Sequence, residues 1–69
     1  MKILESSDLG VAIRSRRKEL HYTQAYISEF TGLSISFISD VENGKPTVEL
    51  EKVIQLLQIL GMDLFVERR

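Results

Sequence analysis

Three serines, Ser34, Ser36 and Ser39, recur at short spacing in the middle of the 69-residue chain. A serine hydroxyl acts as a nucleophile only where a base activates it. The one histidine, His21, lies at a predicted helix end, and there is no cysteine. The chain also lacks a phosphate-binding glycine loop and a carboxylate pair with a pocket to hold it. Hydrogen bonding and helix capping therefore explain the serines better than catalysis, and we do not expect an enzyme.

The cysteine and histidine counts limit which cofactors and covalent cross-links this chain can have. Without cysteine, disulfides and thiolate metal sites are excluded, and one histidine cannot form a histidine-based metal cluster. We therefore expect no cofactor and no metal. A chain this short buries a small core and often needs a further source of stability, and self-association is the one that remains.

Positive charge is concentrated in one segment. Arg14, Arg16, Arg17 and Lys18 fall within five positions, although the net charge of the chain is −1 and its pI about 5.7. A locally basic face is compatible with phosphate contacts, but from charge alone an ordinary solvated helix face is the simpler interpretation. Arg17 differs from its neighbours because the helical spacing puts it on the apolar side, where a guanidinium needs an acidic partner.

Two short helices joined by a tight turn are predicted in the middle of the chain. Thr23 is the predicted N-cap of the first, which spans residues 24–31, and Gly32 supplies the turn because glycine takes positive φ without penalty. Ser34 is the predicted N-cap of the second, which ends near Asn43. The predicted inward residues are Ala25, Ile27, Phe30, Phe37 or Ile38, and Val41.

Another helix is predicted before this pair. Apolar residues between Leu9 and Leu20 recur at the spacings that mark one helix face. Residues 6–8 offer N-cap candidates, and His21 stands where a helix commonly ends in a left-handed residue.

A fourth helix is predicted from about Val48 to Leu60, with Thr47 as its N-cap. One apolar stripe consists of Leu50, Val53, Ile54, Leu57 and Leu60. Leu56 and Ile59 fall outside it, and a chain this small cannot cover two apolar faces of one helix. We therefore expect Leu56 and Ile59 to contact a second copy.

The C-terminal segment predicts one short strand, because Leu64, Phe65 and Val66 have high β-propensity. A lone strand is not stable, since its hydrogen-bonding edges need a partner. That partner is either the N-terminal Ile3–Leu4 segment or the same strand of a second copy. The fourth helix and this strand thus independently favour a homodimer.

The run TQAYISEFTGLSISFISDVENGK, from Thr23 to Lys45, resembles the pattern of the Cro and phage-repressor (XRE) class of helix-turn-helix domains. The resemblance extends from about Leu9 to Leu60. It implies an all-α fold, a compact four- to five-helix lambda-repressor-like DNA-binding domain, with a short C-terminal β-strand that pairs across a dimer. One domain would span residues 1–69, with the helix-turn-helix proper at 23–44 and the dimerisation helix and strand at 47–69.

The resemblance also implies roles for individual residues. It pairs Arg17 with Glu42 as a structural ion pair, and it places the start of the third helix in the major groove. The implied base-reading residues are Ile35, Ser36, Ser39 and Asp40. The implied phosphate contacts are Gln24, Ser34, Asn43 and Lys45, with further positive charge from Arg14, Arg16 and Lys18.

None of the implied base-reading residues is the Arg, Gln or Asn that makes bidentate base contacts. Ile35 suits a thymine methyl group, and Asp40 either accepts from cytosine N4 or faces solvent. Direct readout by one copy is therefore expected to be weak, which leaves more to DNA shape and to assembly.

The tail GMDLFVERR narrows the resemblance to antitoxin regulators of the HipB type. This implies a homodimeric repressor that binds double-stranded DNA at a palindromic operator, autoregulates a toxin–antitoxin operon and binds a HipA-like kinase toxin. The alternatives are a phage-type or restriction-system controller without a toxin partner, and a protein-interaction module that has lost DNA binding.

No apolar run approaches the roughly 20 residues that span a bilayer, and the N-terminus lacks the apolar core of a signal peptide. We therefore expect no membrane partner and a cytoplasmic, nucleoid-associated protein in a bacterium.

Overall fold

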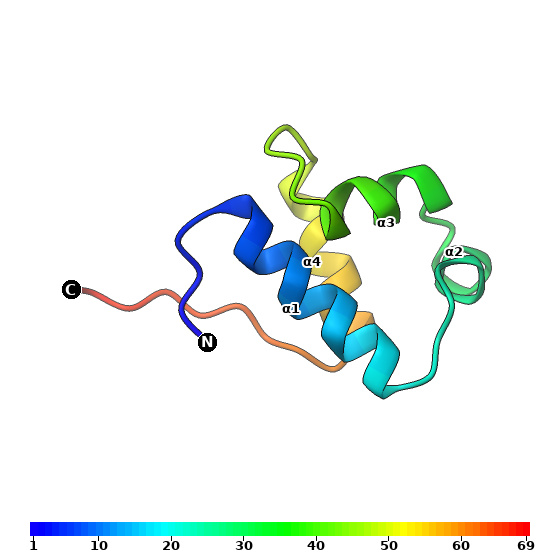
Figure 1. The fold of residues 1–69 in the computed structure, drawn as a ribbon, viewed down its shortest axis with the longest axis horizontal. Coiled ribbons are helices and arrows are strands. Elements are labelled where there is room, and N and C mark those ends of the chain that lie inside the picture. The colour runs from blue at the N-terminus through cyan, green and yellow to red at the C-terminus, as the bar shows by residue number, and fades with distance from the viewer.

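The computed structural model describes residues 1–69 and contains four α-helices and no strand (Figure 1). The helices are α1 (Ser6–Glu19), α2 (Gln24–Thr31), α3 (Ile35–Glu42) and α4 (Leu50–Ile59). α3 packs against both α1 and α2, and a C-terminal tail leaves the end of α4 and runs past α1 (Figure 1). The predicted all-α arrangement is confirmed. None of the four helices has the length and apolarity that crossing a membrane requires.

A single apolar core holds the helices together, and every helix contributes to it. Its members are Ile13, Ile27, Leu33, Ile38, Val41, Val53, Leu56, Leu57 and Leu60. The predicted inward positions Ile27, Ile38 and Val41 are confirmed. The prediction was wrong for Ala25 and Phe30, which are exposed because α2 buries only the stripe that contains Ile27.

Helix α1 begins at Ser6, and its N-cap is Glu5 rather than a residue of the predicted 6–8 segment. The carboxylate of Asp8 accepts hydrogen bonds from the backbone N–H groups of Leu4 and Glu5, at 2.9 and 3.2 Å. Asp8 therefore stabilises the helix start from inside the first turn. At the other end, His21 has φ +61°, which confirms its predicted left-handed conformation.

Helix α4 begins at Leu50, later than predicted, and its N-cap is Glu49. The prediction of Thr47 as the cap was wrong, because residues 46–48 form a turn in which Val48 packs against the core. Because Val48 packs against the core within this turn, α4 begins only after Val48.

The predicted C-terminal strand is not formed in the single chain. Residues 62–69 are extended without ladder hydrogen bonds, and the Ile3–Leu4 segment does not pair with them. A strand exists only with a partner edge, and this chain supplies none of its own. The prediction that the N-terminal segment pairs with this strand is therefore wrong, and pairing with the same strand of a second copy stays a prediction.

Gly10 marks the closest approach of α1 to α3, a feature that the sequence analysis missed. A Cβ atom at Gly10 would lie 2.5 Å from the carbonyl oxygen of Val41 and 2.6 Å from that of Glu42. Both are backbone atoms, which cannot rotate away. Glycine inside a helical pattern was the available signal, since it commonly has a packing reason.

Replacing Gly10 with alanine is expected to lower the free energy of unfolding by about 2 kcal/mol, because overpacking outweighs the better helix propensity of alanine. Urea unfolding followed by circular dichroism measures the change. The matched control is Ser15→Ala, an exposed position of the same helix, expected to stay within about 0.5 kcal/mol of the wild type. Equal stability of the Gly10 variant and the wild type would show that α1 and α3 are not this close.

Candidate nucleic-acid interface

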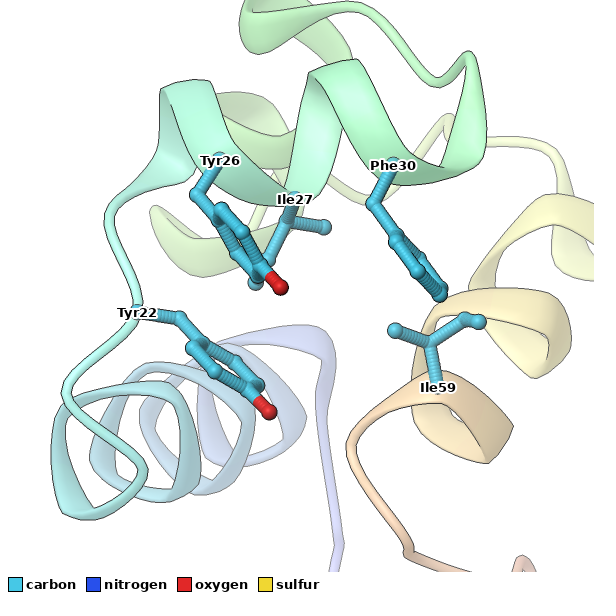
Figure 2. A pocket seen from close by; sticks show the side chains of 5 residues that line it. All are labelled: Tyr22, Tyr26, Ile27, Phe30 and Ile59. Carbon is cyan, nitrogen blue, oxygen red and sulfur yellow. The ribbon is translucent and has the colours of Figure 1, made fainter.

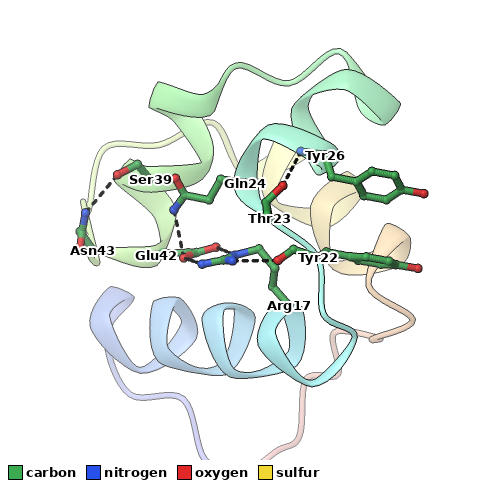
Figure 3. Close-up of polar contacts among 8 residues, drawn as sticks. All are labelled: Arg17, Tyr22, Thr23, Gln24, Tyr26, Ser39, Glu42 and Asn43. Carbon is green, nitrogen blue, oxygen red and sulfur yellow. Dashed lines mark hydrogen bonds and ion pairs between the residues drawn. The ribbon is translucent and has the colours of Figure 1, made fainter.

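A buried ion pair joins α1 to the end of α3 (Figure 3). Arg17 donates from Nε to Oε2 of Glu42 at 2.7 Å and from Nη2 to Oε1 at 2.9 Å. The two side chains are only 11% and 3% exposed. A third guanidinium hydrogen bond reaches the carbonyl oxygen of Tyr22 at 2.9 Å. The predicted ion pair is confirmed. Its two side-by-side hydrogen bonds satisfy both charged groups in a site that is largely closed to water.

Gln24 brings α2 to the same carboxylate. Its Nε2 donates to Oε1 of Glu42 at 3.2 Å, so one carboxylate connects three helices (Figure 3). A glutamine amide carries two N–H donors, and this contact uses one. The predicted phosphate contact of Gln24 stays a prediction that is compatible with the remaining donor.

The pKa of Glu42 lies below its ordinary value of 4.5. Burial opposes ionisation and raises the pKa, but the hydrogen bonds from Arg17 and Gln24 and the charges of Arg17 and Arg14 outweigh it. The pKa of Arg17 is raised, chiefly by its hydrogen bond to Glu42. Both groups are therefore charged in the folded protein near neutral pH.

The turn and caps of the helix pair agree with the sequence. Thr23 and Ser34 each accept a hydrogen bond at 3.0 Å, from the backbone N–H groups of Tyr26 and Phe37 respectively. Gly32 has φ +81° in the turn between them. These caps fix where α2 and α3 begin, and hence which residues stand at the start of α3.

Helix α3 has one buried and one open side. Ile38, Val41 and Glu42 are buried, while Ile35 and Ser36 at the start of the helix are exposed. The open start is the part that a helix-turn-helix protein places in the major groove. The structure therefore brings the predicted base-reading residues Ile35 and Ser36 to an accessible surface.

The remaining polar residues of α3 have partners within the chain. Asn43 donates from Nδ2 to the hydroxyl oxygen of Ser39 at 3.3 Å (Figure 3). Lys45 lies with Nζ 3.4 Å from Oδ2 of Asp40. Ser39 and Asp40 are half-buried, so they are less accessible than the residues at the helix start.

The basic segment of α1 divides into two kinds of residue. Arg14 and Lys18 are exposed and form no ion pair. Arg16 donates from Nε to the carbonyl oxygen of Leu60 at 2.9 Å and pairs with Glu19 at 3.2 Å. Arg16, which the solvated-face interpretation of the basic segment included, is instead half-buried and caps the C-terminal end of α4.

An apolar groove that the sequence analysis missed lies between α2 and the end of α4 (Figure 2). It is lined by Tyr22, Tyr26, Ile27, Phe30 and Ile59. The rings of Tyr22 and Tyr26 have centroids 5.0 Å apart, and those of Tyr26 and Phe30 are 6.3 Å apart. Of the aromatic residues in this groove, Phe30 was predicted to face inward, and the structure leaves it 67% exposed.

The predicted dimer residues fall into two groups. Leu56 is fully buried in the core of its own chain, so its assignment to a dimer contact was wrong. Ile59 is 36% exposed, and the tail residues Leu64, Phe65 and Val66 are 47%, 83% and 96% exposed. These four positions are free to meet a second copy, and that contact stays a prediction.

Comparisons with known proteins agree with this geometry. The helix-turn-helix family description matches residues 13–66. The uncharacterized HTH-type transcriptional regulator y4mF of Sinorhizobium fredii (strain NBRC 101917 / NGR234) is 38% identical over 63 residues, which is 91% of this chain and 83% of y4mF. The ImmF control region 10 kDa protein of Bacillus phage phi105 is 30% identical over 64 residues, covering 93% of this chain and 71% of that protein.

Solved structures share the fold. HipB in its complex with an O4 20mer superposes with a TM-score of 0.89 at 24% identity, covering 99% of this chain and 96% of that chain. A structure of a HipA-HipB-O2-O3 complex gives the same values. The chain therefore belongs to the helix-turn-helix family, whose members use this helix pair to bind DNA.

Replacing Glu42 with glutamine is expected to lower the free energy of unfolding by about 3 kcal/mol at pH 7, because the guanidinium of Arg17 loses its counter-charge in a buried site. The lowered pKa of Glu42 means that its contribution is fully present above about pH 4.5 and is lost as the pH falls through the folded-state pKa. The gap between variant and wild type should therefore stay constant above about pH 4.5 and shrink as the pH falls further, through the lowered pKa of Glu42.

Urea unfolding at a series of pH values measures this gap. The matched control is Glu49→Gln, which removes a carboxylate from an exposed pair with Lys52 at 3.7 Å and should change stability by less than about 0.5 kcal/mol. A gap that is small at pH 7, or that does not depend on pH, would contradict the role of Glu42.

Proposed function

We propose that this chain is a homodimeric transcriptional repressor that reads a palindromic operator and acts as the antitoxin of a toxin–antitoxin pair. The observation that carries the proposal is the orientation of α3. Its C-terminal end is fixed by the buried Arg17–Glu42 pair, and its capped start is open to solvent. A recognition helix requires this combination of a rigid base and an accessible N-terminal end.

In the proposed complex, the start of α3 lies in the major groove. Ser36 hydrogen-bonds to a base edge, and the exposed Ile35 contacts a thymine methyl group. Ser39 and Asp40, one turn further along, lie closer to the groove edge. Short side chains of this kind bring α3 close to the bases but discriminate less than Arg, Gln or Asn would.

Phosphate contacts position the helix on the duplex. Gln24 and Ser34 stand at the starts of α2 and α3, where free backbone N–H groups and the helix dipole favour an anion. Asn43 and Lys45 follow α3, and Arg14 adds positive charge from α1. These contacts supply the salt-dependent part of the affinity.

Dimerisation is supported by the apolar residues that the monomer leaves uncovered. Ile59 and the tail residues Leu64–Val66 lie outside the buried core of their own chain and are exposed. Antiparallel pairing of two such tails would supply the hydrogen-bonding partner that each lacks. Two recognition helices would then lie roughly 34 Å apart, one turn of DNA.

The antitoxin role is supported by the fold shared with HipB, which has been solved with an O4 20mer and in a HipA-HipB-O2-O3 complex. We propose a HipA-like kinase as the partner of this chain. A gene for such a kinase directly beside that of this chain is the expected companion, and its absence would leave a phage-type or restriction-system controller, a reading favoured by the ImmF relative.

A second candidate function is a protein-interaction module without DNA binding. The exposed aromatic groove of Tyr26 and Phe30 favours it, together with the net charge of −1. A mobility-shift assay on the DNA upstream of the chain's own gene, with and without the adjacent gene product, separates the two. No shift at low salt with folded, dimeric protein would remove the repressor.

Substituting Ser36 or Lys45 with alanine should weaken binding to the upstream DNA without loss of helix content. We expect a loss of roughly tenfold for Ser36→Ala, from the lost base contact. For Lys45→Ala we expect a salt dependence that is shallower by about one released ion. Fluorescence anisotropy at several salt concentrations measures both. Lys2→Ala, the same charge change at the exposed N-terminus, is the control.

Deleting residues 64–69 should convert the dimer to monomers, because it removes both the strand and its apolar side chains. Sedimentation velocity measures the change. Deleting only residues 67–69 removes charged residues and should leave the dimer intact. A tight dimer after the longer deletion would show that the exposed face of α4 holds the two copies without the tail.

A further inference from the structure

An ion pair lies at the C-terminal end of α3, on the side of the helix that is proposed to face DNA. Nζ of Lys45 lies 3.4 Å from Oδ2 of Asp40, and the backbone N–H of Lys45 donates to the carbonyl oxygen of Asp40 at 2.9 Å. The backbone contact fixes the two residues beside each other. The side chains of Lys45 and Asp40 are 53% and 47% exposed, so both are within reach of a ligand.

Asp40 places a carboxylate on the surface that is proposed to contact DNA, which is an unexpected position for an acidic residue. It follows Ser36 by four residues, so it lies on the same face of α3 as the proposed base-reading residues. A carboxylate on this face is repelled by DNA phosphates. Lys45 is the one hydrogen-bonding partner of the Asp40 carboxylate, and the same lysine is a proposed phosphate contact.

We propose that Asp40 determines specificity by acting as an exchangeable counter-ion of Lys45. This inference rests on the proposed function, since it concerns the same DNA-binding surface. In the free protein, Asp40 neutralises Lys45. On DNA, Lys45 moves to a phosphate only at a cost, because the Asp40 carboxylate is then left unpaired beside a negatively charged surface.

The operator removes this cost by supplying a new partner. Only the amino groups of cytosine and adenine donate hydrogen bonds in the major groove, and a carboxylate accepts well from cytosine N4. Where such an amino group faces Asp40, the Asp40 carboxylate releases Lys45 and accepts a hydrogen bond from the base instead. Lys45 can then bind a DNA phosphate. Elsewhere the pair stays closed and Lys45 adds little affinity.

The strength of the pair suits this exchange. An ion pair between half-exposed side chains contributes little in water, so it opens without unfolding the helix end. A fully buried pair such as Arg17–Glu42 could not open in this way. On unrelated DNA, opening the pair would leave the Asp40 carboxylate uncompensated, and this cost, more than the loss of the contact itself, keeps the pair closed.

The test uses the full chain and a 20-base-pair duplex of random sequence, with binding measured by fluorescence anisotropy at several salt concentrations. Asp40→Ala is expected to tighten binding to random DNA about threefold to tenfold and to steepen the salt dependence by about one released ion. In a Lys45→Gln background the same substitution should change little. Glu51→Gln, an equal charge change on α4, is the matched control, and circular dichroism checks the fold.

Three results would overturn the exchange. Unchanged binding of Asp40→Ala to random DNA would show that the pair does not restrain Lys45. Equal tightening with and without Lys45 would show general repulsion by the carboxylate. Failure of the folded wild type to bind any duplex at low salt would contradict the proposed function itself and, with it, this inference.

The upstream DNA provides the complementary measurement. Once the protected site is mapped there, Asp40→Ala should lower the ratio of site affinity to random-DNA affinity about tenfold or more, because a good base contact of this kind is worth a factor of that order. An unchanged ratio would contradict a role of Asp40 in specificity.

Discussion

One buried carboxylate sets the geometry of the DNA-binding surface. Glu42, the last residue of α3, accepts hydrogen bonds from Arg17 in α1 and Gln24 in α2, so three helices meet at two oxygen atoms. Desolvating a charged pair costs free energy that the pair itself barely recovers, so its main effect is to exclude other arrangements. The start of α3 points away from the core because its end is held in this one position.

Sequence reasoning located this pair only in part. The spacing of α1 put Arg17 on the apolar side and so required an acidic partner, which is a physical argument. It did not say which acid, because Glu42 is 25 residues away and helical periodicity carries no information over that distance. The family resemblance supplied the partner. The turn and caps needed no such help, since Thr23, Gly32 and Ser34 act on neighbouring backbone atoms.

The errors occurred where an element has more apolar residues than its own chain covers. α4 offers several stripes, and periodicity does not fix the rotation of the helix. The carbonyl of Leu60 receives a hydrogen bond from Arg16 of α1, a contact across 44 residues. The resulting buried positions are Val53, Leu56, Leu57 and Leu60. Leu50 and Ile59 are left exposed, so the monomer leaves part of the apolar surface of α4 uncovered; of the two residues predicted there, Ile59 is exposed and Leu56 is buried.

The charge distribution supports the expectation that one copy of the proposed DNA-binding surface reads DNA weakly. Of the basic residues near α3, Arg17 and Arg16 are committed to contacts inside the chain, and Lys45 is held by Asp40. Arg14 and Lys18 of α1 are exposed and form no ion pair. In the proposed complex, few free cations beside α3 would release few counter-ions, which would keep non-specific affinity low. Under the proposed function, short base-reading side chains would gain selectivity from low background binding and from the fixed spacing of two copies. The uncovered tail would then be as important as α3.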